Sequence, residues 1–167
     1  MRIICLVFCL LLTSCFESQS SENWSFTTSK DKISDKETFL AYARSKSGHG
    51  AFVISCDTKA VGFLKPEVFA DRPLTYRGGS RQMFIVRIDS ENPIFLRWRV
   101  IESVAVLDPE DEGIEHLASY IGNGSNLIVR MQSTDEHDFD MEFDVRGLQK
   151  AIDHMSVKCD PRAIQLR

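Results

Sequence analysis

The sequence lacks the short motifs that mark common catalytic and metal-binding sites. Its histidines are scattered and show no HExxH or similar metal spacing: His49, His116, His137 and His154. It contains no GxSxG elbow, no P-loop and no CxxC pair of the zinc-site kind. We therefore expect no enzyme activity, no cofactor and no metal. A Ser-His-Asp hydrolase is the open exception, because its triad assembles in space and leaves no linear trace.

The chain also lacks an excess of positive charge and, after its first residues, any long apolar run. It has 20 Lys and Arg against 24 Asp and Glu, a formal net charge of −4. This balance argues against nucleic acid or an anionic membrane surface as the main partner. No later stretch approaches the roughly 20 apolar residues of a transmembrane helix. The length of 167 residues fits one domain after a short leader.

The first residues have the pattern of a lipoprotein signal peptide. Arg2 is followed by an apolar run over 3–12, and the motif Leu12-Thr13-Ser14-Cys15 follows directly. Small residues before a cysteine suit the lipoprotein-processing peptidase, so we expect removal of 1–14 and a diacylglyceryl group on the Cys15 thiol. The alternative is an ordinary secretory peptide that is cut elsewhere.

Lipidation at Cys15 would fix where the protein works. Residues 15–23 would be the lipidated cysteine and a polar, flexible spacer. We expect a bacterial lipoprotein with palmitate-type acylation, anchored in the cell membrane or outer membrane and facing the periplasm. Phe16 after the cysteine, in place of an aspartate, favours the outer membrane.

Few cysteines remain after this processing. Of the five, Cys5 and Cys9 would leave with the leader and Cys15 would carry the lipid. The remaining pair, Cys56 and Cys159, would meet an oxidising compartment, so we predict a disulfide between them. Two buried free thiols or a mixed disulfide are the alternatives.

Alternating apolar and polar residues predict a series of antiparallel strands. Strands are expected at 24–28, 37–45, 51–56, 60–64, 82–89, 94–101, 126–132 and 138–145, with a short helix as the alternative at 37–45. Residues 66–73 are expected to form a loop or an irregular edge, and 75–77 a short strand.

Two segments have the apolar spacing of helices, 109–121 and 147–158. Asp108 and Pro109 are suited to the start of the first. The predicted class is therefore α+β: an antiparallel sheet, sandwich-like or curved, with two helices packed on it. The domain would span 24–160, followed by a tail at 161–167.

Acidic residues alternate with apolar ones near the C-terminal end, at Asp138, Asp140, Glu142 and Asp144. In a strand they would share one face. We favour a solvated sheet face with Arg130 of the neighbouring strand opposite an acid. A calcium site or a docking site for a cationic partner is the alternative, since hard cations need several oxygen ligands.

Two arginines, Arg97 and Arg99, flank Trp98, and Arg87 falls on the expected partner strand. The plain interpretation is an exposed basic face that balances the charge of the acidic strand. The functional alternative is a clamp for an anion or a peptide carboxylate, because guanidinium groups present a planar fork of donors.

Several scattered features give the chain a family resemblance. They are Trp24, the segment Val86-Arg87-Ile88-Asp89 with Pro93 and Trp98 downstream, Cys56 after an apolar strand, and the closing run 143–159 (FDVRGLQKAIDHMSVKC). Together they resemble the small exported proteins of the type VI secretion-associated VasI type. A weaker likeness is to the exported family of the invasion-associated locus B type. Both imply an accessory periplasmic protein, and neither supplies a catalytic residue.

The expected function is that of a lipid-anchored periplasmic accessory or binding protein of the bacterial envelope, associated with a secretion system if the resemblance holds. Its partners would be the membrane, through the lipid, and an envelope protein. The predicted partner-binding residues are Asp138, Asp140, Glu142, Asp144, Arg97 and Arg99. The alternative is an immunity or inhibitor lipoprotein that blocks an attacking enzyme or phage.

Overall fold

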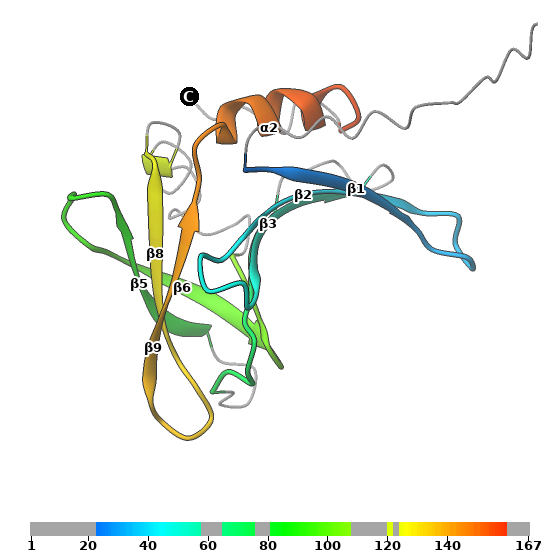
Figure 1. The fold of residues 1–167 in the computed structure, drawn as a ribbon. Coiled ribbons are helices and arrows are strands. Elements are labelled where there is room, and N and C mark those ends of the chain that lie inside the picture. The colour runs from blue at the N-terminus through cyan, green and yellow to red at the C-terminus, as the bar shows by residue number, and fades with distance from the viewer. Residues whose placement is uncertain (1–22, 58–64, 76–80, 108–119, 122–123, 160–167) are drawn as a thin grey trace, which may run out of the picture.

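The computed structural model describes residues 23–57, 65–75, 81–107, 120–121 and 124–159 (Figure 1). Nine strands form one antiparallel sheet in the order β1-β2-β3-β4-β7-β6-β5-β8-β9. They are β1 (Ser25–Lys30), β2 (Glu37–Arg44), β3 (Ala51–Asp57), β4 (Lys65–Phe69), β5 (Arg81–Ile88), β6 (Ile94–Ile101), β7 (Val104–Val106), β8 (Asn126–Gln132) and β9 (Asp138–Asp144). The only helix that the described residues include in full is α2 (Leu148–Ser156).

The predicted class, α+β with two helices packed on the sheet, is wrong. The described chain is one large antiparallel sheet with a single short helix of nine residues. The sheet curls on itself and supplies most of its own core, so it does not need a helical layer. The first expected helix, 109–121, lies outside the described residues except for Tyr120 and Ile121, which are helical. The strand expected at 60–64 also lies outside them.

The strand β4 occupies part of the stretch expected to be a loop. Pro66 argued against a strand there, because proline cannot donate to a ladder. In the structure the Pro66 carbonyl accepts a hydrogen bond from Leu107 N at 3.1 Å, so the carbonyl and the nitrogen of Pro66 face the side of β4 on which β7 lies. The β7 ladder covers only Glu67 to Phe69. The missing N–H lies just beyond this ladder, and Pro66 keeps its place opposite Ile54 in the β3–β4 ladder.

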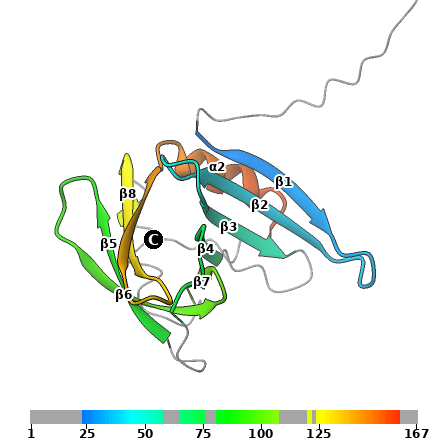
Figure 2. The ribbon, with the colours of Figure 1, turned by 60° about the horizontal axis from the view of Figure 1, so that its bottom comes forward.

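The sheet curls so that its last strand returns to the turn after its second strand (Figure 2). Ser45 and Phe143 form a bridge, and Lys46 N donates to Glu142 O at 2.8 Å. Trp24, which is fully buried, donates from its indole Nε1 to Arg146 O at 3.1 Å. These contacts join segments about a hundred residues apart and enclose a single core.

The core is built from alternate residues of the strands, because successive side chains point to opposite faces. Phe84 and Trp98 pack with their ring centroids 5.6 Å apart, and Phe52 and Phe143 with theirs 6.0 Å apart. Inward residues of β5, β6 and β8 are nearly all buried: Phe84, Val86, Ile88, Leu96, Trp98, Val100, Leu127, Val129 and Met131.

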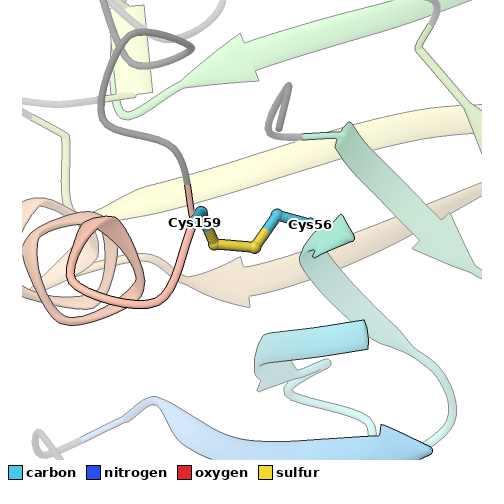
Figure 3. Close-up of a disulfide and its surroundings, with 2 residues drawn as sticks. All are labelled: Cys56 and Cys159. Carbon is cyan, nitrogen blue, oxygen red and sulfur yellow. A yellow bond between two sulfur atoms is a disulfide. The ribbon is translucent and has the colours of Figure 1, made fainter. Parts of the chain in front are cut away.

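The helix α2 lies over β1, β2 and β3 in Figure 1 and is tied to the sheet by a disulfide (Figure 3). Its predicted apolar stripe is confirmed, since its apolar side chains are buried: Leu148, Ala151, Ile152 and Met155. The predicted Cys56–Cys159 pairing is also found, with the Cα atoms 6.3 Å apart. Cys56 lies near the end of β3, and Cys159 N donates to Met155 O just after the helix.

Candidate functional site

The side chains of β5 and β6 that point away from the core include no acid. We call them the β5–β6 outer face: Arg81, Met83, Ile85 and Arg87 on β5, and Phe95, Arg97, Arg99 and Ile101 on β6. All are exposed except Ile85, which is half-buried. The face therefore consists of arginine and large apolar residues alone.

The strand register divides most of this face into two ends. Arg81 lies opposite Arg99, and Arg97 lies opposite Met83, so three guanidinium groups gather at one end. Like charges directly opposite each other on a sheet are destabilising. We call Arg81, Arg97 and Arg99 the arginine end. The side chain of Arg97 makes no hydrogen bond or ion pair with any described residue.

The next rows of the face are apolar and largely open to solvent, and Arg87 follows them on β5. Ile85 lies opposite Phe95, with Met83 one step along the same face. The exposed fractions are 64% for Phe95 and 54% for Met83, which is unusual for side chains of this size. We call Met83, Ile85 and Phe95 the apolar end. Arginine, methionine and aromatic residues without lysine or acids form the composition typical of protein interfaces.

The acidic residues of β9 share a face, as the sequence predicts, and three of the four, Asp140, Glu142 and Asp144, are paired with cations of the same chain. Arg130 lies opposite Asp140 and donates to it twice, from Nε at 2.7 Å and from Nη2 at 2.8 Å. Lys46 pairs with Glu142, and Arg146 pairs with Asp144. The predicted position of Arg130 opposite an acid is thus confirmed, and the arrangement favours the solvated-face interpretation.

These pairs lower the pKa of the carboxyl groups involved. The hydrogen bonds from Arg130 hold the pKa of Asp140 below its usual value, and those from Lys46 do the same for the pKa of Glu142. Arg146 lowers the pKa of Asp144 through its side chain first and its backbone N–H second. All three acids are therefore ionised at neutral pH and are engaged by cations of the same chain.

We expect the substitution Arg130→Gln to destabilise the protein at neutral pH but not in acid. Because the folded-state pKa of Asp140 is depressed, its contribution is present above the unfolded-state pKa of about 3.9 and is lost as the pH falls through the folded value. Thermal unfolding followed from neutral pH down to about pH 2 should show the Tm difference from wild type shrinking to zero.

The matched control for this experiment is Arg44→Gln. Arg44 is an exposed arginine of β2 that has no carboxylate partner among the described residues. Its effect on Tm should not vary with pH over the same range. If the two variants give parallel curves, the pair between Arg130 and Asp140 adds nothing to stability.

Other polar clusters in the described part of the chain do not assemble catalytic chemistry. The buried Ser45 hydroxyl donates to the backbone oxygen of His49, not to its ring. Ser133 donates to Asp135 and to the backbone oxygen of His137. No three His, Cys, Asp or Glu side chains of the described ranges gather in a way that would hold a metal ion. His116 lies outside these ranges.

The N-terminal segment predicted to carry the lipid, including Cys15, lies outside the described residues. Within 23–159, apart from the stretches left undescribed, no helix has the length and apolarity to cross a membrane. The signal peptide, the lipidation and the location of the protein stay predictions.

Comparison with known proteins gives one likeness in structure. No family model matches the sequence, and no curated protein does. The crystal structure of the invasion associated protein B from Bartonella henselae is similar over 80% of this chain and 90% of that chain. The two are 12% identical, with a TM-score of 0.48. Values this low transfer no function, and the resemblance to the VasI type stays a prediction.

Proposed function

We propose that this protein is a lipid-anchored binding or accessory protein of the bacterial envelope, and that a partner protein docks on its β5–β6 outer face. The observation that carries the proposal is the composition of that face: exposed arginines and large apolar side chains with no acid among them. Contiguous exposed apolar surface is uncommon on soluble proteins and, where it occurs, often marks an interaction site.

The position of these side chains favours docking over catalysis. They lie on regular neighbouring strands of a sheet, whereas catalytic groups more often lie on loops that a scaffold positions. Of the two charged surfaces predicted to bind a partner, the arginine surface is the better candidate. Three of the four acids of β9 are already engaged by Arg130, Lys46 and Arg146.

The proposed anchor would keep the domain close to the membrane. Nine residues, 15–23, separate the expected lipid from Trp24, which is buried in the core. A fully extended chain of that length reaches about 30 Å at most. The partner is therefore a protein of the same membrane or one that comes close to its surface.

The proposal is tested by photo-crosslinking in living cells. A photoreactive phenylalanine analogue replaces Phe95 in the full-length chain, and the same analogue at Thr27 on the exposed face of β1 serves as the control. We expect a covalent adduct with another protein from position 95 and none from position 27. Adding Cys15→Ser should release the protein from the membrane fraction and reduce the adduct.

Two results would contradict the proposal. If position 95 gives no adduct, the outer face does not dock a protein. If Cys15→Ser leaves the protein in the membrane fraction, the lipid anchor is wrong, although the docking face is then still decided by the adduct.

A further inference from the structure

We propose that two copies of this protein pair along the free edge of β1, antiparallel and centred on Thr28, so that their sheets become continuous. The strand β1 ends the sheet and pairs only with β2. In Figure 2 it forms the outer rim of the molecule, with no described element beyond it. This surface is distinct from the β5–β6 outer face, and the inference does not depend on docking there.

The register shows which backbone groups of β1 lie on its free side. Asp31 N donates to Lys36 O at 2.8 Å, which continues the ladder between β1 and β2 by one pair. Hydrogen-bonded and non-bonded pairs alternate along an antiparallel ladder, so every second residue back from Asp31 directs its N–H and C=O to β2. The residues between them, Phe26, Thr28 and Lys30, direct theirs to the other side, where no described residue bonds to these backbone groups.

The two edges of the sheet are protected very differently. An open edge is a template for pairing, and proteins usually block it with charge, proline, a bulge or a covering segment. The edge of β9 has two of these devices, because Lys46 N donates to Glu142 O and four acids alternate along the strand. The strand β1 has no proline and no bulge, since its six pairs with β2 are consecutive, and Lys30 is its only charge. Its edge is therefore open to a further strand.

The sequence of β1 is complementary to a second copy of itself. A two-fold axis normal to the sheet at Thr28 would bond Thr28 to Thr28 and Phe26 to Lys30, which gives about six hydrogen bonds between the copies. Opposed threonines are a favourable cross-strand pair, and the two lysines would lie about 13 Å apart along the strands. Each Lys30 would instead lie opposite the half-buried Phe26 of the other copy.

The pairing should be weak in solution and stronger on a membrane. One pair of strands buries little surface, and the formal net charge of −4 makes the two copies repel each other. Salt screens this repulsion, so pairing should increase with ionic strength. The proposed anchor at Cys15 would raise the local concentration of the chain and offset the small size of the contact.

The test is photo-crosslinking of the full-length chain, in cells and in isolated membranes, with the photoreactive phenylalanine analogue at Thr27. Position 27 should give no adduct with another protein, but we expect one with a second copy of this chain, identified by mass spectrometry. The crosslink should map near Ser29, which lies opposite Thr27 in this register, and its yield should rise with salt. The same analogue at Arg44, exposed on β2, should give none.

The substitution Thr28→Pro tests the backbone of the edge. It removes an N–H on the free side and leaves the ladder with β2 intact, so the adduct yield should fall about tenfold or more while Tm stays near that of the wild type. The matched variant Ser29→Pro removes an N–H that pairs with β2 and should lower Tm. If Thr28→Pro lowers Tm as much as Ser29→Pro does, the free side of β1 is wrongly assigned and the inference fails.

Charges at position 28 test the register without proline. Thr28→Asp and Thr28→Lys each place like charges opposite each other in a pair of identical copies, so each should reduce the yield. Two chains that carry one substitution each, expressed together with different tags, should restore it as a mixed pair. No restoration would mean that Thr28 does not lie opposite Thr28, which overturns the proposed pairing.

The remaining outcomes also contradict the inference, each in its own way. If the adduct with a second copy persists in Thr28→Pro, the two copies meet on another surface. If position 27 captures a different protein and Thr28→Pro prevents it, the edge takes a strand of that protein. No adduct from position 27, or a yield that falls as salt rises, disproves self-pairing, while docking on the β5–β6 outer face is still decided at position 95.

Discussion

Replacing Cys56 and Cys159 together by alanine should lower the free energy of unfolding by about 4–5 kcal/mol. The bond joins residues 103 positions apart. For a loop of about a hundred residues, the chain-entropy model gives about 4.7 kcal/mol from the unfolded state alone. Since a whole domain is commonly stable by only about 5–15 kcal/mol, this one bond carries a large share of the total.

The site of the bond adds to the expected loss. Cys56 and Cys159 are 1% and 3% exposed, so alanine at both positions also leaves small voids between α2 and β3. The helix would then be held to the sheet only by its apolar stripe and its chain connection. We expect hydrogen exchange in α2 to rise more than exchange in β5, β6 and β8.

The measurement is urea unfolding of the mature domain with and without the two substitutions, analysed for both midpoint and slope. The control is the wild type unfolded in the presence of a reductant, which breaks the bond without adding a group and should show most of the loss of the double variant. A loss below about 1 kcal/mol would mean that the bond does not restrict the unfolded chain as its span requires.

Local patterns predicted most strands, because the sheet has one buried and one exposed face over much of its length. The residues of β6 and β8 match the predicted ranges, 94–101 and 126–132, since a buried apolar side chain recurs at every second position there. The strand β4 was missed, because the position of Pro66 at the end of a ladder depends on where β7 stops. No local pattern contains that information.

Sequence patterns also do not predict that the sheet closes on itself. Closure depends on contacts such as Lys46 N to Glu142 O, between backbone groups that have no residue-specific signature. The sequence predicts two helices on the sheet, because an amphipathic segment needs a surface on which to bury its apolar side. In the structure the sheet curls, so its inner face packs mainly against itself.

The candidate site was recognised in part. Arg97 and Arg99 were identified from their position on either side of Trp98, but Arg81, Met83 and Phe95 were not. A signal was available: with Leu96, Trp98 and Val100 assigned to the core, the alternation of β6 leaves Phe95 outside. The pairing of Arg81 with Arg99 needed the register, which the turn after β5 sets and the sequence pattern does not.

The closure makes a second strong prediction, at Gly50. Its φ of +89° is a left-handed conformation, and its carbonyl accepts from Ser45 N at 3.1 Å. A Cβ at this position would overlap the Met141 side chain and the Phe69 backbone oxygen. Gly50 is therefore the point at which the turn after β2 passes between β4 and β9 with no room for a side chain.

We expect Gly50→Ala to cost about 2–5 kcal/mol, of which about 1–2 kcal/mol is backbone strain and the rest is overlap with the neighbouring strands. The matched control is Gly48→Ala in the same turn. Gly48 has a φ of +79°, but its Cβ would meet no atom within 4 Å, so it should show the strain alone. The difference between the two losses, measured by urea unfolding, reports the steric part.

That difference tests the packing around Gly50, where Phe69 lies because it is opposite Ala51 in the β3–β4 ladder and Met141 lies because the sheet curls. The Met141 side chain can move, whereas the Phe69 oxygen belongs to the β4 backbone and yields only if β4 moves away from the turn. Equal losses for the two variants would show that β4 and β9 do not close around Gly50 in solution. A larger loss for Gly50→Ala would show that the turn is packed against its neighbours as the structure has it, with no room for a side chain at Gly50.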